Sequence, residues 1–137
     1  MDTQELNIEA LEKNLPQVLR FVDDLLELAG CPVKTQLQID LAVEEIFVNI
    51  ADYAYASGEG SAVIRAEISE NPRKAVITFF DRGIPYDPLE KKDPDVTLSA
   101  GERPVGGLGI FLTKKSMDEV TYAYKDGQNV LTMIKRW

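Results

Sequence analysis

Histidine is missing from this 137-residue chain, and cysteine occurs once, at Cys31. Without histidine the chain has no histidine-based metal site, no Ser-His or Cys-His nucleophile pair and no phosphohistidine of its own. A lone cysteine forms neither an internal disulfide nor a CxxC motif, and its rarity fits a reducing compartment. These absences exclude enzymes that depend on a histidine metal ligand, on a Ser-His or Cys-His pair, or on a CxxC motif.

Basic residues and long apolar runs are also scarce. The chain has 15 Lys and Arg against 23 Asp and Glu, a formal net charge of −8, so we expect no direct binding to nucleic acid. No apolar run approaches the roughly 20 residues that span a bilayer, and the N-terminal residues lack the basic and apolar regions of a signal peptide. We therefore expect a cytoplasmic protein without a membrane segment.

The residues that are present describe one globular domain. Hydrophobic residues make up 45% of the chain, which is typical of a packed protein and too many for a disordered one. A typical domain has about 100–200 residues, so we predict a single domain over residues 1–137.

Hydrophobic periodicity predicts both strands and helices. Alternation indicates strands at about 4–8, 62–69, 74–81, 119–125 and 129–136. Helical spacing indicates helices at about 16–29, 33–56 and 108–117. Short turns join the third strand to the second and the fifth to the fourth as hairpins. We predict an α+β fold, a two-layer α/β sandwich whose mixed, mostly antiparallel sheet is covered on one face by three helices.

Glu45 and Asn49 lie one turn apart on the helix predicted over 33–56. An Asn side-chain oxygen is a hard ligand that suits Mg²⁺, and a carboxylate one turn away can accept a proton from an attacking hydroxyl. The alternative is that these residues, with Glu44, only solvate an exposed helix face.

Asp81 and Gly83 follow the most apolar predicted strand. A carboxylate that leaves a buried strand can accept a hydrogen bond from an exocyclic amine such as N6 of adenine, and a glycine lets a ligand approach the backbone closely. The alternative is a simple turn, because Asp, Gly and Pro are the standard turn residues.

A glycine-rich stretch, Gly106–Gly109, lies between a long loop and the last predicted helix. Backbone N–H groups and the positive end of the helix dipole at such a place suit phosphates. Arg103 in the loop and Lys114 and Lys115 on the helix could meet phosphate charge. The alternatives are a flexible loop and solvated lysines placed by the helix dipole.

The three motifs occur in an order that resembles the GHKL ATPase superfamily of gyrase, Hsp90, histidine kinases and MutL. Within it, three strings resemble the anti-sigma factor serine kinases of the RsbW and SpoIIAB type: LAVEEIFVN at 41–49, DRGIPYDP at 81–88 and GGLGIFL at 106–112. The resemblance covers essentially the whole chain. It implies the Bergerat ATPase fold and the ligands ATP and Mg²⁺.

The resemblance also implies roles for the helix and strand motifs. Glu45 would be the general base that accepts the proton of a substrate hydroxyl, and Asn49 would coordinate Mg²⁺ on the ATP phosphates. Asp81 would bind N6 of adenine, and Gly83 would permit close approach of the base.

Further roles follow for the second half of the chain. Gly107, Leu108 and Gly109 would give backbone donors to the phosphates, and the segment from about 86 to 105 would be the ATP lid. Thr132, on the last strand, would support adenine near Asp81.

Partners are implied in the same way. Members of this subfamily phosphorylate a serine on a STAS-domain anti-anti-sigma protein and sequester a sigma factor, usually as homodimers. One position departs from the pattern: Tyr53 stands where the subfamily often has a histidine, so a role that needs titration near neutral pH is in doubt there.

Two other functions remain open from the sequence. The chain could be a regulatory module that binds ATP or ADP and sequesters a partner without phosphoryl transfer. It could also be a detached histidine-kinase catalytic domain, which would need a separate histidine-bearing protein as its substrate.

Overall fold

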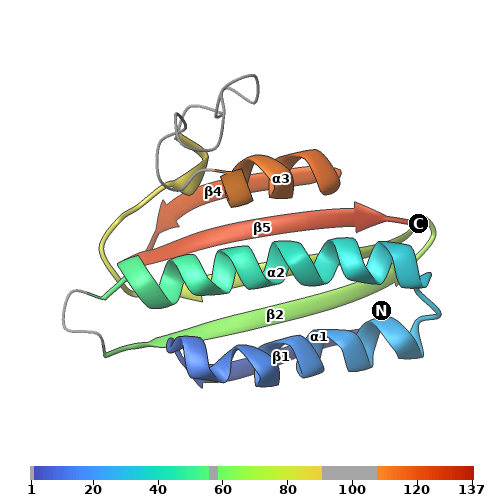
Figure 1. The fold of residues 1–137 in the computed structure, drawn as a ribbon, viewed down its shortest axis with the longest axis horizontal. Helices are drawn as coiled ribbons and strands as arrows, with labels where there is room; N and C mark the ends of the chain where they lie inside the picture. The colour runs from blue at the N-terminus through green and yellow to red at the C-terminus, as the bar shows by residue number, and fades with distance from the viewer. Residues whose placement is uncertain (1, 56–58, 91–107) are drawn as a thin grey trace.

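The computed structural model describes residues 2–55, 59–90 and 108–137 (Figure 1). In this part of the chain the strands are β1 (Asp2–Glu9), β2 (Ser61–Glu70), β3 (Arg73–Asp81), β4 (Glu119–Lys125) and β5 (Gln128–Arg136). The helices are α1 (Leu15–Leu28), α2 (Val33–Tyr53) and α3 (Leu108–Ser116), with short 3₁₀ turns at Glu12–Asn14 and Pro88–Glu90. None of the described helices is long and apolar enough to cross a membrane.

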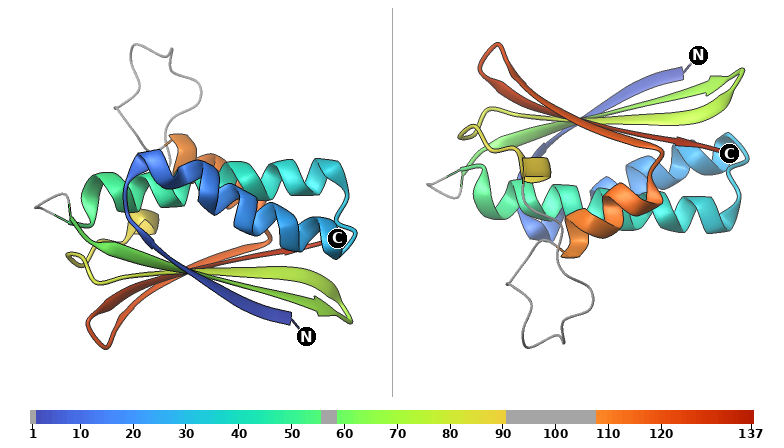
Figure 2. Two further views of the ribbon diagram at one scale, coloured as in Figure 1. Left: turned by 90° about the horizontal axis from the view of Figure 1, so that it is seen from below. Right: turned by 90° about the horizontal axis from the view of Figure 1, so that it is seen from above.

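The described strands form one sheet in the order β1-β2-β3-β5-β4. Every neighbouring pair is antiparallel, so the sheet formed by the described strands is antiparallel and not mixed. Figure 2 shows the helices together on one face of the twisted sheet. The predicted α+β two-layer sandwich is confirmed.

Local signals in the sequence set the ends of the elements. α1 begins at Leu15 with Pro16 in its first turn, where the missing N–H of proline breaks no hydrogen bond. Gly30, with φ of 73°, follows its C-terminus, a conformation that glycine adopts without strain. α2 ends at Tyr53, a few residues before the predicted limit of 56.

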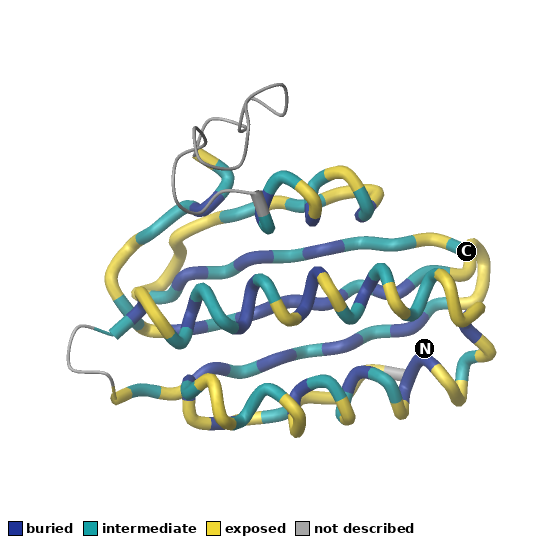
Figure 3. Tube along the Cα trace, viewed as in Figure 1, coloured by how far each residue is buried: buried dark blue, intermediate teal, exposed yellow. Residues whose placement is uncertain are grey.

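The core lies between the helices and the sheet. Phe47 of α2, Ile64 of β2 and Phe79 of β3 are each at most 1% exposed. Figure 3 shows buried positions that alternate along β2 and recur at helical spacing along α2. Ile46 and Ile50 of α2 are both buried, and this fixes the rotation of the helix about its own axis. Asn49, which lies between them in the sequence, is therefore held at the edge of the core.

Only the first part of the predicted lid at about 86–105 falls within the described residues. There, the Leu89 backbone N–H donates to Oδ1 of Asp87 at 2.8 Å and supports the turn at Pro88–Glu90. The rest of this segment, with Arg103, and the glycines Gly106 and Gly107 lie outside the described residues.

Candidate functional site

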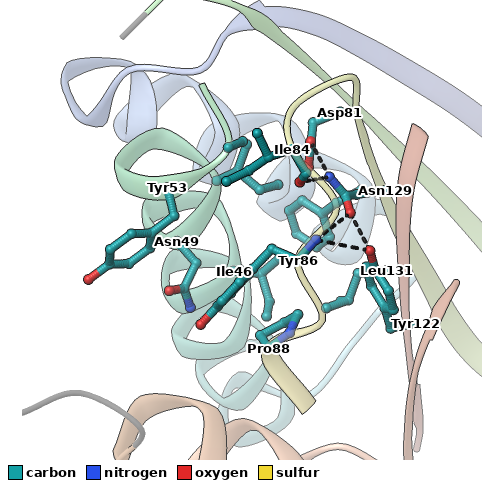
Figure 4. A pocket seen from close by; sticks show the side chains of 13 residues that line it. Ile46, Asn49, Tyr53, Asp81, Ile84, Tyr86, Pro88, Tyr122, Asn129 and Leu131 are labelled. Atoms are coloured by element: carbon teal, nitrogen blue, oxygen red, sulfur yellow. Dashed lines mark hydrogen bonds between the residues drawn. The ribbon is translucent and has the colours of Figure 1, made fainter. Parts of the chain in front are cut away.

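A pocket opens where the C-terminal half of α2 meets the sheet (Figure 4). Its lining includes Asn49 of α2, Asp81 at the end of β3, Asn129 at the start of β5, Tyr122 of β4, and Tyr86 of the segment after β3. Two of the three predicted motifs, far apart in the sequence, therefore contribute to the same cavity.

Asp81 is buried in this pocket, with 6% of its surface exposed. Its Oδ1 accepts hydrogen bonds from Asn129 Nδ2 at 2.8 Å and from the Gly83 backbone N–H at 2.9 Å. Burial raises the pKa of Asp81, and these two hydrogen bonds partly offset the rise because they favour the charged form. Both bonds from described residues end on Oδ1, so Oδ2 is the oxygen available to an N–H group of a ligand.

Asn129 is the hub of a hydrogen-bond network around Asp81. Its Nδ2 also donates to the Ile84 carbonyl oxygen at 2.8 Å. Its Oδ1 accepts from the Tyr86 backbone N–H at 3.1 Å and from the Tyr122 hydroxyl. Figure 4 shows these bonds joining β5 to β4 and to the segment after β3. Asn129 thus fixes both the carboxylate and the chain that borders it.

The structure does not bring Thr132 to this pocket. In the pairing of β3 with β5, Asp81 lies opposite Asn129 and Thr78 lies opposite Thr132. Residues three apart on a strand face opposite sides, so Thr132 lies on the sheet face away from Asp81. The place beside Asp81 that the sequence prediction gave to Thr132 is held by Asn129.

Sequence reasoning also missed Asn129, Tyr86 and Tyr122 as pocket residues. For Asn129 a signal was present: the same face of β5 carries buried Leu131 and Met133, so a buried amide at its first inward position breaks an apolar pattern. A buried polar side chain needs hydrogen-bond partners, which Asp81 supplies here.

Glu45 lies at the junction of α2 and α3. Asn49 Nδ2 donates a long hydrogen bond of 3.5 Å to Glu45 Oε1. The Glu45 carboxyl group is packed so closely against Gly109 that a Cβ atom there would lie 2.0–2.4 Å from its carbon and oxygens. The third motif therefore meets the first, because a glycine at 109 leaves room for the carboxylate beside the first turn of α3.

Gly83 makes a different close contact. A Cβ atom at this position would lie 2.1 Å from the Ala54 carbonyl oxygen, and the next residue, Ile84, donates its backbone N–H to that oxygen at 2.9 Å. The observed close approach is thus to the end of α2. An approach of Gly83 to a bound base stays a prediction.

The predicted phosphate contacts are only partly within the described residues. Leu108 and Gly109 form the start of α3, where the first backbone N–H groups of a helix have no partner within the helix. Lys115, at the other end of α3, places its Nζ 5.4 Å from the centre of the Phe111 ring. The roles of Gly107, Leu108, Gly109 and Arg103 toward phosphate stay predictions.

The residues of this site suit a magnesium ion that takes most of its coordinating oxygens from phosphate and water and few from the protein. Among the described residues, no group of three or more Cys, Asp or Glu side chains is arranged to bind a metal. Asn49 turns its Nδ2 toward Glu45, which leaves its Oδ1 for an ion at the pocket. Mg²⁺ commonly takes few protein ligands and completes its shell with phosphate and water oxygens.

The fold and this pocket together define a small nucleotide-binding domain of the ATPase class: an antiparallel sheet with helices on one face, a buried carboxylate, and a helix N-terminus near an Asn-Glu pair. The model of the histidine kinase-like ATPase domain family matches residues 8–135. The chain belongs to this family.

The chain is similar in sequence to bacterial serine kinases. It is 25% identical to the serine/threonine-protein kinase BtrW of Bordetella bronchiseptica over 96% of this chain and 91% of BtrW. It is 26% identical to the serine-protein kinase RsbW of Staphylococcus aureus over 98% of this chain and 86% of RsbW. The resemblance to RsbW-type kinases is confirmed.

A solved structure agrees with the fold. The RsbU and RsbW domains of Rv1364c from Mycobacterium tuberculosis superpose with a TM-score of 0.70 at 15% identity. The match covers 99% of this chain and 32% of the mycobacterial chain, so this protein corresponds to about a third of that longer one.

Proposed function

We propose that the chain is an ATP-dependent protein-serine kinase that phosphorylates a STAS-domain anti-anti-sigma protein and sequesters a sigma factor, acting as a cytoplasmic homodimer. One observation carries the proposal: Asn49 and Asp81 line one pocket, and Glu45 is hydrogen-bonded to Asn49. The serine kinase names of the relatives support the reaction class.

Asp81 recognises the adenine base. Its Oδ2 accepts a hydrogen bond from the N6 amine, for which the carboxylate must be charged. Asn129 and the Gly83 N–H stabilise that charge by donating to Oδ1.

The pocket must widen to hold a base. Its volume of about 40 Å³ is only a few times the roughly 10–15 Å³ that a cavity needs to hold one water molecule. The side chains at its rim include Ile84, which is 55% exposed, and the Tyr53 and Tyr86 rings, whose centres are 6.1 Å apart. Outward rotation of these rim side chains provides the room.

Asn49 and the start of α3 serve the phosphates. Asn49 Oδ1 would hold Mg²⁺, and a bound Mg²⁺ would neutralise phosphate charge. The N–H groups at the start of α3 add a positive dipole end on the other side of Glu45.

Glu45 activates the acceptor. Its carboxylate accepts the proton of the serine hydroxyl while the hydroxyl oxygen forms a bond to the γ-phosphorus. The bond from that phosphorus to the bridging oxygen breaks, and ADP leaves. Such a transfer needs positioning and charge neutralisation more than covalent help from the protein.

The test is transfer of labelled phosphate from ATP to STAS-domain proteins of the same organism. We expect Glu45→Ala to abolish transfer but retain ATP binding, and Asn49→Ala to lose Mg²⁺-dependent ATP affinity. Asp52→Asn, an exposed charge change on the same helix, is the matched control and should transfer normally.

Normal transfer by both site variants would refute these roles. ATP binding without any labelled acceptor in the wild type would instead favour a module that binds nucleotide and sequesters a partner.

A further inference from the structure

A second hollow, a groove of about 330 Å³, runs between α2 and α3. Leu41, Ala42 and Glu45 line it from α2, and Gly109, Leu112 and Thr113 line it from α3. The groove is separate from the pocket of Asp81, whose lining includes Asn49 but not Glu45. The hydrogen bond from Asn49 to Glu45 links the two hollows.

The groove carries unusually exposed leucines on both of its sides. Leu41 of α2 is 67% exposed and Leu112 of α3 is 54% exposed. Single exposed apolar residues are ordinary, but Leu41 and Leu112 line the same groove from opposite helices and so offer apolar contacts to a molecule that enters it.

The lining selects among molecules that could bind there. Glu44 and Glu45 of α2 and Lys115 of α3 line the groove together, so its charges favour neither an anion nor a cation, whereas Leu41 and Leu112 offer apolar contacts and Glu45 offers a hydrogen-bond acceptor. A polypeptide with an apolar side chain and a neutral hydroxyl fits both features, because the apolar group packs against the leucines and the hydroxyl reaches the Glu45 carboxylate.

The geometry of phosphate transfer also favours an acceptor polypeptide in this groove. The attacking oxygen must approach phosphorus opposite to the leaving ADP. If the nucleotide lies in the pocket of Asn49 and Asp81, the acceptor approaches along Glu45, which faces the groove.

We propose that this groove seats the acceptor protein at the segment around its phosphorylated serine or threonine, with an apolar side chain of that segment between Leu41 and Leu112. The proposal rests on the proposed kinase function and adds the surface by which the kinase selects its substrate. Glu45, in the same groove, then receives the hydroxyl proton without further movement of the helices.

The test is steady-state transfer to the acceptor protein by Leu41→Asp and Leu112→Asp. Both side chains are exposed, so the fold should survive, and thermal unfolding of each variant checks this. We expect the KM for the acceptor to rise about tenfold or more, since an apolar contact is replaced by a buried charge, with a smaller change in kcat. Leu28→Asp, at an 85% exposed leucine on α1, is the matched control and should leave KM unchanged.

The outcomes separate this proposal from the proposed function. Transfer by the wild type with an unchanged KM in both groove variants would overturn the docking surface and leave the kinase intact. No transfer by the wild type to any STAS-domain protein of the organism would overturn the function itself. Loss of self-association in Leu41→Asp, measured by light scattering, with unchanged KM would make the groove an interface between copies of this chain and overturn the proposal.

Discussion

Gly109 shows how a single missing side chain shapes the site, because the Glu45 carboxyl group fills the space where its Cβ would lie. We expect Gly109→Ala to retain the fold, since the end of a glutamate side chain can move, but to displace the carboxylate. Small misplacements of reacting groups can lower rates by roughly 100-fold. Phosphate transfer and thermal unfolding, measured together, test this. A normal transfer rate would contradict the assigned position of Glu45.

Substitution of Gly83, unlike that of Gly109, should destabilise the fold. Its Cβ would meet backbone atoms of Ala54, which cannot move without shifting the end of α2. We expect Gly83→Ala to lower the free energy of unfolding by about 2 kcal/mol or more, as substitutions that overpack a rigid site commonly do. Chemical denaturation measures this, and an unchanged midpoint would contradict the tight contact.

Asn129 should set the pH range of nucleotide binding through Asp81. Burial already raises the pKa of Asp81, and the hydrogen bond from Asn129 lowers it again. In Asn129→Ala the pKa rises further, so protonation of Asp81 should weaken ATP binding at a higher pH than in the wild type. ATP affinity measured across pH tests the shift. Thr132→Ala, on the other face of the sheet, should keep the wild-type profile, and an unshifted Asn129→Ala profile would contradict the network.

The residues of the site differ in how far the sequence predicts them. Glu45 and Asn49 could be placed side by side because helical spacing is local. Asp81 could be placed at a strand end by the turn residues after it. Asn129 could not be paired with Asp81, because strand register between β3 and β5 is set by packing across the sheet and not by a connecting turn.

At the scale of elements, the contact of α1 with α2 holds an acidic pair. Oδ1 of Asp23 and Oδ1 of Asp40 are both buried, and neither accepts a hydrogen bond from a donor among the described residues. Burial, the side chain of Asp23 and, more weakly, the charge of Glu27 raise the pKa of Asp40 to about 8. The pKa of the nearby Cys31 thiol is also raised, first by its own burial and then by the charge of Asp40.

This pair should make the stability of the protein depend on pH. The unfolded chain loses the Asp40 proton near pH 4, whereas the folded chain keeps it to about pH 8, so stability falls as pH rises between these values. We expect Asp40→Asn to remove this fall and to stabilise the protein at pH 8 by on the order of 1 kcal/mol, a modest value because the site is partly open to water.

Unfolding measured at pH 5 and pH 8 checks the prediction. The gain from Asp40→Asn should be larger at pH 8. Asp24→Asn, an exposed charge change on α1, should show no such difference, and an equal gain at both pH values in Asp40→Asn would contradict the raised pKa of Asp40.

Elements with local signals were predictable, and their arrangement was less so. The turn between β4 and β5 is formed by Asp126 and Gly127, with φ values of 54° and 77°, which is the conformation that an Asp-Gly pair in a tight hairpin favours. The place of β5 between β3 and β4 has no such signal, because it depends on which strand edge is left free to pair.

At the scale of the whole molecule, this strand order assembles the site. β5 next to β3 brings Asn129 to Asp81, and α3 against α2 brings Gly109 to Glu45. α2 joins the two halves, since Glu45 faces the groove and Asn49 faces the pocket. In the proposed function, Asn49 and Asp81, which are distant in sequence, therefore bind the two ends of one nucleotide.

The most direct test of this central claim is the affinity of the protein for ATP and GTP, each with and without Mg²⁺, by calorimetry. We predict that Asn49→Ala loses the dependence on Mg²⁺ but still prefers ATP over GTP. Asp81→Asn should lose the preference for ATP and keep the dependence on Mg²⁺. If both variants kept both properties, the two side chains would not hold one nucleotide, and the account would be contradicted.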